Sequence, residues 1–241
     1  MKKVLPIALL LVGILVFVGV YFFVIRKPDA EVVDDEDLSA MIEVSLEDRP
    51  VAMLIPRADG HWWDLTVSKL GRFEAEMLEY ELLYEVPDKT PQGTGSVIPL
   101  NKDEVTREIL IGTESSGNYY YDSGVERGTL TLKFRNDKGK LVAKFSTQFH
   151  FQSEVDEVST VDGAFTLALD DEYDDYFVTM ETFGVPEGLE GDVSDGPYGV
   201  FSSNDEITGT PSLGGSIMVW NGDWEAVSGE SPLGIFVSTS N

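Results

Sequence analysis

One long uncharged segment near the N-terminus limits what this chain can fold into. No charged side chain occurs from Val4 to Ile25, and most of these 22 residues are Leu, Val, Ile or Phe. At a rise of about 1.5 Å per residue they would form a helix of roughly 33 Å, long enough to cross the hydrocarbon core of a bilayer. The sequence therefore predicts one N-terminal transmembrane helix, whose lipid-facing residues include Val4, Leu10, Leu15, Phe17, Phe22 and Ile25.

A cleaved signal peptide is the alternative interpretation of this segment. Such a peptide has an apolar core of about 7 to 15 residues, followed by small residues at its cleavage site. Here the apolar core is longer, and bulky or charged residues occupy its end, from Tyr21 to Lys27. We therefore expect an uncleaved anchor over residues 1–27. Because only three residues precede the helix, we expect a cytoplasmic N-terminus, a single pass through the cell membrane and an extracytoplasmic C-terminal domain.

The rest of the chain is strongly acidic. All 43 acidic residues follow Lys27, whereas four of the 17 basic residues lie in the anchor, which leaves 13 basic residues and a formal charge of −30. Such a surface repels nucleic acid and anionic lipid headgroups, and it attracts cations and basic proteins. The predicted partners are therefore membrane lipid, through the N-terminal helix, and an unidentified protein for which a basic surface is favoured, but no nucleic acid.

Alternating apolar and polar residues dominate the chain from residue 42 onward. Residues 78–86, 130–134 and 141–151 show the period of two that is typical of half-buried strands. Polar turn residues, Asn136–Gly139 and Asn221–Gly222, separate pairs of such runs and predict two hairpins. Outside the anchor, no segment shows a helical period over more than two turns. The sequence therefore predicts an all-β ectodomain, an antiparallel β-sandwich of immunoglobulin-like architecture.

Two polar, acidic segments suggest how the chain is divided. Residues 28–40 show no apolar period and are interpreted as an acidic stalk after the anchor. Residues 154–162 are a possible linker, or a long loop. We expect a β-sandwich module over residues 41–153, and residues 163–241 form either a second module or a continuation of the same sandwich. One large sandwich and two small ones both remain open.

Side chains suited to catalysis are scarce. The two histidines, His61 and His150, are 89 positions apart, and the chain contains no Cys. A zinc site is therefore disfavoured, and surface or packed positions are favoured for both histidines. Neither a nucleophile elbow nor a phosphate-binding loop is present. We expect a protein that is not an enzyme and that needs no cofactor, with calcium as the one ion to consider.

The densest acidic run is the reason to consider calcium. Ca²⁺ takes about six to eight oxygen ligands, and a carboxylate-rich connection between strands can supply several of them. Against this, the spacing of a known calcium loop is absent, and adjacent residues of a strand point in opposite directions. A solvated acidic loop is the competing interpretation. The candidate ligands are Asp170, Asp171, Glu172, Asp174 and Asp175.

Exposed aromatic side chains are the other candidate binding residues. Because successive residues of a strand face opposite sides, one of two adjacent tryptophans is expected on the outer face of a sheet. Flat rings there could stack on sugar rings, although packing at loop ends or between modules is the competing interpretation. The candidates are Trp62, Trp63, Tyr120, Trp220 and Trp224.

The sequence as a whole predicts a membrane-anchored, extracytoplasmic β-sandwich protein. An uncleaved anchor next to a domain without catalytic motifs favours a structural or protein-binding role at the cell envelope. Carbohydrate or cell-wall binding through the exposed aromatic residues is the alternative.

Overall fold

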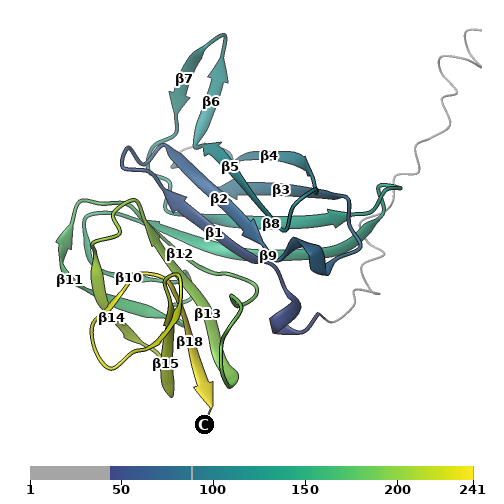
Figure 1. The fold of residues 1–241 in the computed structure, drawn as a ribbon. Coiled ribbons are helices and arrows are strands. Elements are labelled where there is room, and N and C mark those ends of the chain that lie inside the picture. The colour runs from purple at the N-terminus through teal and green to yellow at the C-terminus, as the bar shows by residue number, and fades with distance from the viewer. Residues whose placement is uncertain (1–43, 88, 241) are drawn as a thin grey trace, which may run out of the picture. The chain divides into compact units, whose positions relative to one another are not determined.

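The computed structural model describes residues 44–87 and 89–240 (Figure 1). The predicted anchor, its lipid-facing residues and the predicted stalk lie outside the described residues. Apart from strands, the described part contains two short 3-10 turns, η3 (Leu46–Asp48) and η4 (Leu70–Arg72). In that part, no helix has the length and apolar character needed to cross a membrane. The expectation of an all-β fold built from antiparallel sheets is confirmed.

A nine-stranded antiparallel sheet is the centre of the fold. In spatial order it contains β16 (Trp224–Ala226), β15 (Ser216–Trp220), β18 (Ile235–Ser240), β13 (Asp192–Ser202), β12 (Phe177–Glu181), β9 (Leu141–Gln152), β8 (Arg127–Arg135), β3 (Met77–Tyr84) and β4 (Gln92–Pro99).

Three smaller sheets complete the described part. A three-stranded sheet contains β1 (Val51–Pro56), β2 (Trp62–Ser68) and β5 (Glu104–Leu110). A four-stranded sheet contains β10 (Val155–Ser159), β11 (Thr166–Tyr173), β14 (Thr208–Ser212) and β17 (Ser231–Pro232). A two-stranded hairpin contains β6 (Gly112–Ser115) and β7 (Asn118–Tyr121).

The first hydrophobic core lies between the three-stranded sheet and the β9–β8–β3–β4 part of the large sheet. Every second residue of β2 is buried, so Trp63, Leu65 and Val67 point inward. They belong to the same core as alternate residues of β3 and β8, such as Leu82 and Phe134. Each fully buried side chain of this size stabilises the fold by about 1.5–3 kcal/mol.

The second core lies on the opposite face of the large sheet. Along β12, Val178 and Met180 belong to the first core, whereas Phe177 belongs to the second. Because neighbouring residues of a strand face opposite sides, the two cores must lie on opposite faces. The adjacent strand β13 shows the same division between Phe201 and Val200. The four-stranded sheet covers this second face, as its residues in the second core show.

The large sheet contains strands from both of the parts that were expected from the sequence, residues 41–153 and residues 163–241. Strand β9, at the end of residues 41–153, pairs directly with β12, which belongs to residues 163–241. The possible linker, residues 154–162, contains β10, which pairs with β11 in the four-stranded sheet. Residues Met41–Asn241 accordingly form one compact unit.

Both predicted hairpins are present. Between β8 and β9, Oδ1 of Asn136 accepts hydrogen bonds from the backbone N–H groups of Lys138 and Lys140, each at 3.0 Å. Gly139 in the same turn has a φ of 74°, which favours glycine. Between β15 and β16, Trp220 and Trp224 are direct cross-strand partners on either side of the Asn–Gly turn.

Candidate functional site

The β6–β7 hairpin stands apart from the other sheets (Figure 1). Its two strands pair only with each other, from Gly112 opposite Tyr121 to Ser115 opposite Asn118. Ser116 and Gly117 form the turn with φ values of 53° and 79°. Two left-handed residues in a two-residue turn match the twist of antiparallel strands, so the turn holds the hairpin in register.

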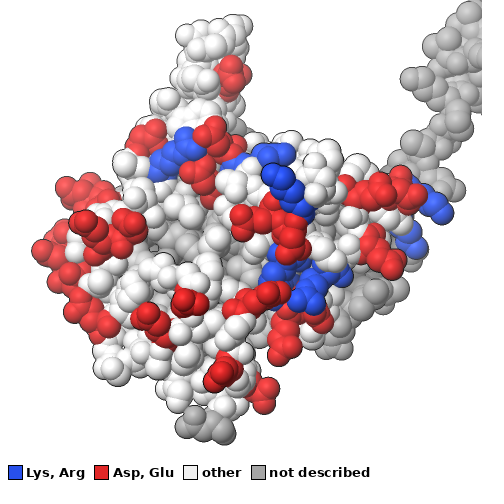
Figure 2. Space-filling model, in the orientation of Figure 1, with Lys and Arg blue, Asp and Glu red and all other residues white. Residues whose placement is uncertain are grey.

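Three consecutive tyrosines give this hairpin an apolar surface. Tyr119, Tyr120 and Tyr121 are 46%, 62% and 43% exposed, and in the described part only Leu83 and Val97 are other large apolar side chains with comparable exposure. The hairpin carries one charged residue, Glu114. In Figure 2 it stands out as almost uncharged above a surface with many acidic side chains. An exposed apolar concentration of this kind is typical of an interaction site.

Ring contacts attach the base of the hairpin to the rest of the domain. Tyr119 and Tyr121 share one face, with ring centroids 6.5 Å apart and planes 7° from parallel. Trp62 contacts Tyr119 edge-on at 5.6 Å, and His61 stacks on Tyr121 at 4.1 Å. Tyr120 points to the opposite face because it lies between them in the strand. The hairpin therefore has one face that meets Trp62 and His61 and one face with Tyr120.

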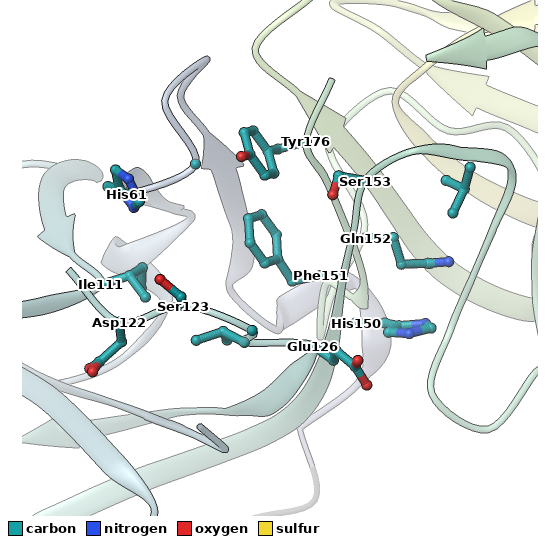
Figure 3. A pocket seen from close by; sticks show the side chains of 14 residues that line it. His61, Ile111, Asp122, Ser123, Glu126, His150, Phe151, Gln152, Ser153 and Tyr176 are labelled. Atoms are coloured by element: carbon teal, nitrogen blue, oxygen red, sulfur yellow. The ribbon is translucent and has the colours of Figure 1, made fainter. Parts of the chain in front are cut away.

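A pocket of about 460 Å³ lies beside the base of the hairpin (Figure 3). It is formed by the residues before β2, Ile111 between β5 and β6, the segment between β7 and β8, the end of β9, the start of β10 and Tyr176 before β12. His61 and His150 both line it, although they are far apart in the sequence. Its lining contains two carboxylates, Asp122 and Glu126, and no Lys or Arg.

The two carboxylates of the pocket differ in their partners. Asp122 accepts from Nζ of Lys89 at 2.7 Å and from the hydroxyl of Tyr84 at 3.1 Å. Burial, together with this carboxylate, raises the pKa of Tyr84 to about 12. Glu126 is exposed, and it forms no ion pair with the described residues. Glu126 is therefore the carboxylate that remains available to a ligand.

The hydrogen bond of His150 determines which ring nitrogen is free. Nδ1 lies 2.8 Å from the carbonyl oxygen of Ser159. Because a carbonyl can only accept, Nδ1 must carry the proton, and Nε2 of the neutral ring is then an acceptor.

An aromatic stack forms the apolar wall of the pocket. Phe151 and Tyr176 stack with centroids 5.3 Å apart, and Trp63 packs on Phe151 at 4.7 Å. Gly60 lies against Tyr176, since a Cβ at position 60 would be 2.6 Å from the ring. Gly60 also has a φ of 68°. Glycine is therefore required at this position by both close contact and backbone conformation.

The five predicted calcium ligands are not gathered into a site. Asp170, Asp171 and Glu172 belong to β11, whereas Asp174 and Asp175 follow it. Asp170 accepts a hydrogen bond from the hydroxyl of Tyr173 at 2.9 Å, and Asp175 from the amide of Asn204 at 3.4 Å. Within residues 44–87 and 89–240, no group of three or more His, Cys, Asp or Glu side chains could hold a metal ion. The described geometry therefore gives the calcium hypothesis no support.

The structure divides the predicted aromatic residues instead of forming one platform. Trp62 is half-buried and meets the hairpin that carries Tyr120. Trp63 is 0% exposed and belongs to the first core, so it cannot contact a ligand. The alternation of β2 predicts one inner and one outer tryptophan, and packing makes Trp63 the inner one. Trp220 and Trp224 lie at the opposite end of the nine-stranded sheet from β4 and belong to another hairpin.

Sequence reasoning missed the position of the pocket and the pairing of His61 with Tyr121. The available signal was the run Asn118–Tyr121 after Ser116–Gly117, since a small turn followed by aromatic residues resembles the second strand of a hairpin.

Comparisons of the chain with protein-family models, with curated proteins and with solved structures gave no match. Its function must therefore be inferred from its own residues.

Proposed function

We propose that this chain is a membrane-anchored, extracytoplasmic protein of the cell envelope that binds a protein partner through the β6–β7 hairpin. The observation that carries the proposal is the exposure of three consecutive tyrosines on a hairpin that pairs with no other described strand. An isolated two-stranded hairpin is only marginally stable, so contact with a partner would both bury the tyrosines and stabilise the strands.

Tyrosine suits such a contact for two reasons. Its ring offers a large rigid area at a low cost in side-chain entropy, and its hydroxyl can pair with a polar group at the rim of an interface. The outer edges of β6 and β7 add unpaired backbone N–H and C=O groups, since neither strand has a second neighbour. A partner strand could hydrogen-bond along either edge.

The sequence supports the rest of the proposal. The uncharged run from Val4 to Ile25 favours a permanent anchor, and the acidic remainder favours a basic partner. Immunoglobulin-like architecture is the proposed form of the β-sandwich, and a non-enzymatic role follows from the scarcity of catalytic motifs. In this arrangement the anchor holds the hairpin at the cell surface.

Site-specific photocrosslinking in native membranes tests the proposal. A photoreactive phenylalanine in place of Tyr120 should yield a discrete adduct with one protein, because this side chain is 62% exposed on the hairpin. The same residue at position 83, where Leu83 is 45% exposed on β3, is the matched control and should yield no such adduct. Replacing Tyr119 and Tyr121 by Ser should abolish the adduct at position 120. An adduct pattern identical at the two positions would reject the hairpin as the binding element.

Carbohydrate or cell-wall binding is the second candidate function. It is favoured by the proximity of Trp62, Tyr119, Tyr121 and His61, whose rings meet at the base of the hairpin. Binding to a glycan array that disappears in Trp62→Ala and persists in Trp220→Ala would place the sugar at this hairpin. Loss only in Trp220→Ala would place it at the β15–β16 hairpin, and flat binding curves would remove the candidate.

A further inference from the structure

We infer that the pocket beside the hairpin receives a positively charged side chain of the protein partner, with arginine as the best fit. The inference rests on the proposed protein-binding function, and it assigns a second contact to the same partner. Three properties of the pocket carry it: its charge, its mixture of apolar and hydrogen-bonding groups, and its continuity with the hairpin.

The charge of the pocket favours a cation. Glu126 is exposed and has no ion-pair partner in the described part of the chain, and no basic residue lines the pocket. The basic side chains nearest in sequence or contact are already paired, Lys89 with Asp122 at 2.7 Å and Arg127 with Glu85 at 2.9 Å. An anionic ligand would therefore meet the charge of Glu126, and no basic residue of the lining would offset it. The acidic remainder of the domain would also raise the local concentration of cationic groups.

The hydrogen-bonding groups of the pocket are suited to a ligand rich in donors. The carboxylate of Glu126 and the hydroxyl of Ser123 can accept hydrogen bonds, and so can Nε2 of His150 when its ring carries no charge. A guanidinium group has five N–H donors and no acceptor, which matches a lining whose polar groups accept hydrogen bonds. An ammonium group has three donors and a more compact charge, which makes lysine the weaker match.

The apolar wall provides a place for the stem of the same side chain. Figure 3 shows Phe151 and Tyr176 close together, with Asp122 and Glu126 lower in the view. Arginine and lysine commonly lay their methylene groups along an apolar surface while the charged end reaches polar groups. A pocket of about 460 Å³ is large enough for a group of this kind, since small-ligand sites start at about 300 Å³.

His61 makes the pocket and the hairpin one continuous surface. It lines the pocket, and its ring stacks on Tyr121 at 4.1 Å. Ser123, also in the lining, follows Tyr121 by two positions. A single partner can therefore insert a basic side chain into the pocket while its surface covers the tyrosines.

The two histidines provide a direct readout of the pocket. They are the only histidines in the chain, and both line the pocket, so the NMR signal of the Cε1–H group of each imidazole reports on the occupancy of the pocket. The full chain in detergent micelles is titrated with N-acetylarginine N-methylamide, which imitates an arginine inside a protein, at constant ionic strength. The neutral isostere N-acetylcitrulline N-methylamide is titrated in parallel. We expect both imidazole signals to shift with the arginine compound and to stay in place with the citrulline compound.

A pair of matched variants identifies the charge that matters. Glu126→Gln should weaken binding of the arginine compound about three- to fivefold, as expected for one exposed ion pair. Glu157→Gln removes the same charge from an exposed position on β10 outside the pocket and should leave the affinity unchanged. Equal weakening by the two variants, or equal shifts with citrulline, would overturn the inference.

Three further outcomes separate a small-molecule cation from a protein side chain, and the pocket inference from the proposed function of the hairpin. Tighter binding of free arginine than of the capped compound would assign the pocket to a small-molecule amine and overturn the side-chain inference. If crosslinking at position 120 succeeds while neither histidine signal moves with the arginine compound, the pocket inference fails alone. If both signals move but crosslinking fails, the proposed function of the hairpin is rejected, and with it the assignment of the cation to a protein partner.

Discussion

Replacing Phe177 by Ala should destabilise the packing around the first core, although Phe177 belongs to the second core. Phe177 is 0% exposed and belongs to the second core, whereas its neighbour Val178 belongs to the first. Truncating a buried Phe to Ala costs about 3–5 kcal/mol, because transfer free energy is lost and a cavity remains. Since β12 hydrogen-bonds to β9 in the shared sheet, we expect this loss to lower the stability of the whole unit.

The magnitude can be measured as a shift in the denaturation midpoint. For a guanidinium m-value of about 5 kcal/mol/M, a loss of 3–5 kcal/mol lowers the midpoint by about 0.6–1 M. The reporter is the fluorescence of Trp62 and Trp63 on β2, in the full chain with Trp220 and Trp224 replaced by Phe. In the same background, Val97→Ala, at a side chain that is 55% exposed, should change stability by less than about 0.5 kcal/mol.

Independent unfolding of the parts around the two cores would refute this reasoning. In that case Phe177→Ala would leave the midpoint reported by Trp62 and Trp63 unchanged, while far-UV circular dichroism would show a separate, earlier transition. Coincident transitions by both methods, shifted together by the substitution, are the expected result.

Three other substitutions test local features. Tyr84→Phe should remove the hydrogen bond to Asp122 and cost about 1 kcal/mol. Because the pKa of Tyr84 is about 12 in the folded state and about 10 in the unfolded state, the wild type should also lose stability as pH rises from about 10 to 12. Thermal melts across this range should show a smaller loss of stability in the variant. Lys69→Met should destabilise the fold by about 1–3 kcal/mol in chemical denaturation, since Nζ of Lys69 donates to two backbone carbonyls, that of Val185 at 2.9 Å. Gly60→Ala should lower stability by a similar amount and should abolish the shift of the His61 signal with the arginine compound. Gly163→Ala is the control, because Gly163 also has a positive φ but open space around it, and it should leave that shift intact.

The parts of the fold that depend on local patterns could be predicted from the sequence. Alternation over residues 78–86 and 130–151 located β3, β8 and β9, and the turn residues at Asn136 and Asn221 located two hairpins. The rule that successive residues of a strand face opposite sides did not by itself assign Trp62 and Trp63 to the outer and the inner face. Packing in the first core makes Trp63 the inner one.

Features that depend on long-range pairing could not be predicted. The sequence gives no sign that β12 pairs with β9 on one side and with β13 on the other, or that β18 lies between β15 and β13. The polar composition of residues 154–162 suggested a linker or a long loop, because Asp156 and Glu157 of β10 are exposed. The pocket joins His61, which precedes β2, with the end of β9, which belongs to a different sheet, so residue spacing alone could not have predicted it.

The shared sheet also determines where the chain can tolerate change. In β12, residues Phe177–Met180 are all buried, and in β18 the same holds for Ile235–Ser238, because each strand has a core on both of its faces. A substitution at one of these positions must fit the core that its side chain enters. It must also leave the backbone of the strand in place, because the neighbouring residues of that strand pack in the other core. Hairpins and loops have no such double requirement. Sequence variation that alters recognition should therefore accumulate at the β6–β7 hairpin and the pocket rim, while these two central strands change slowly.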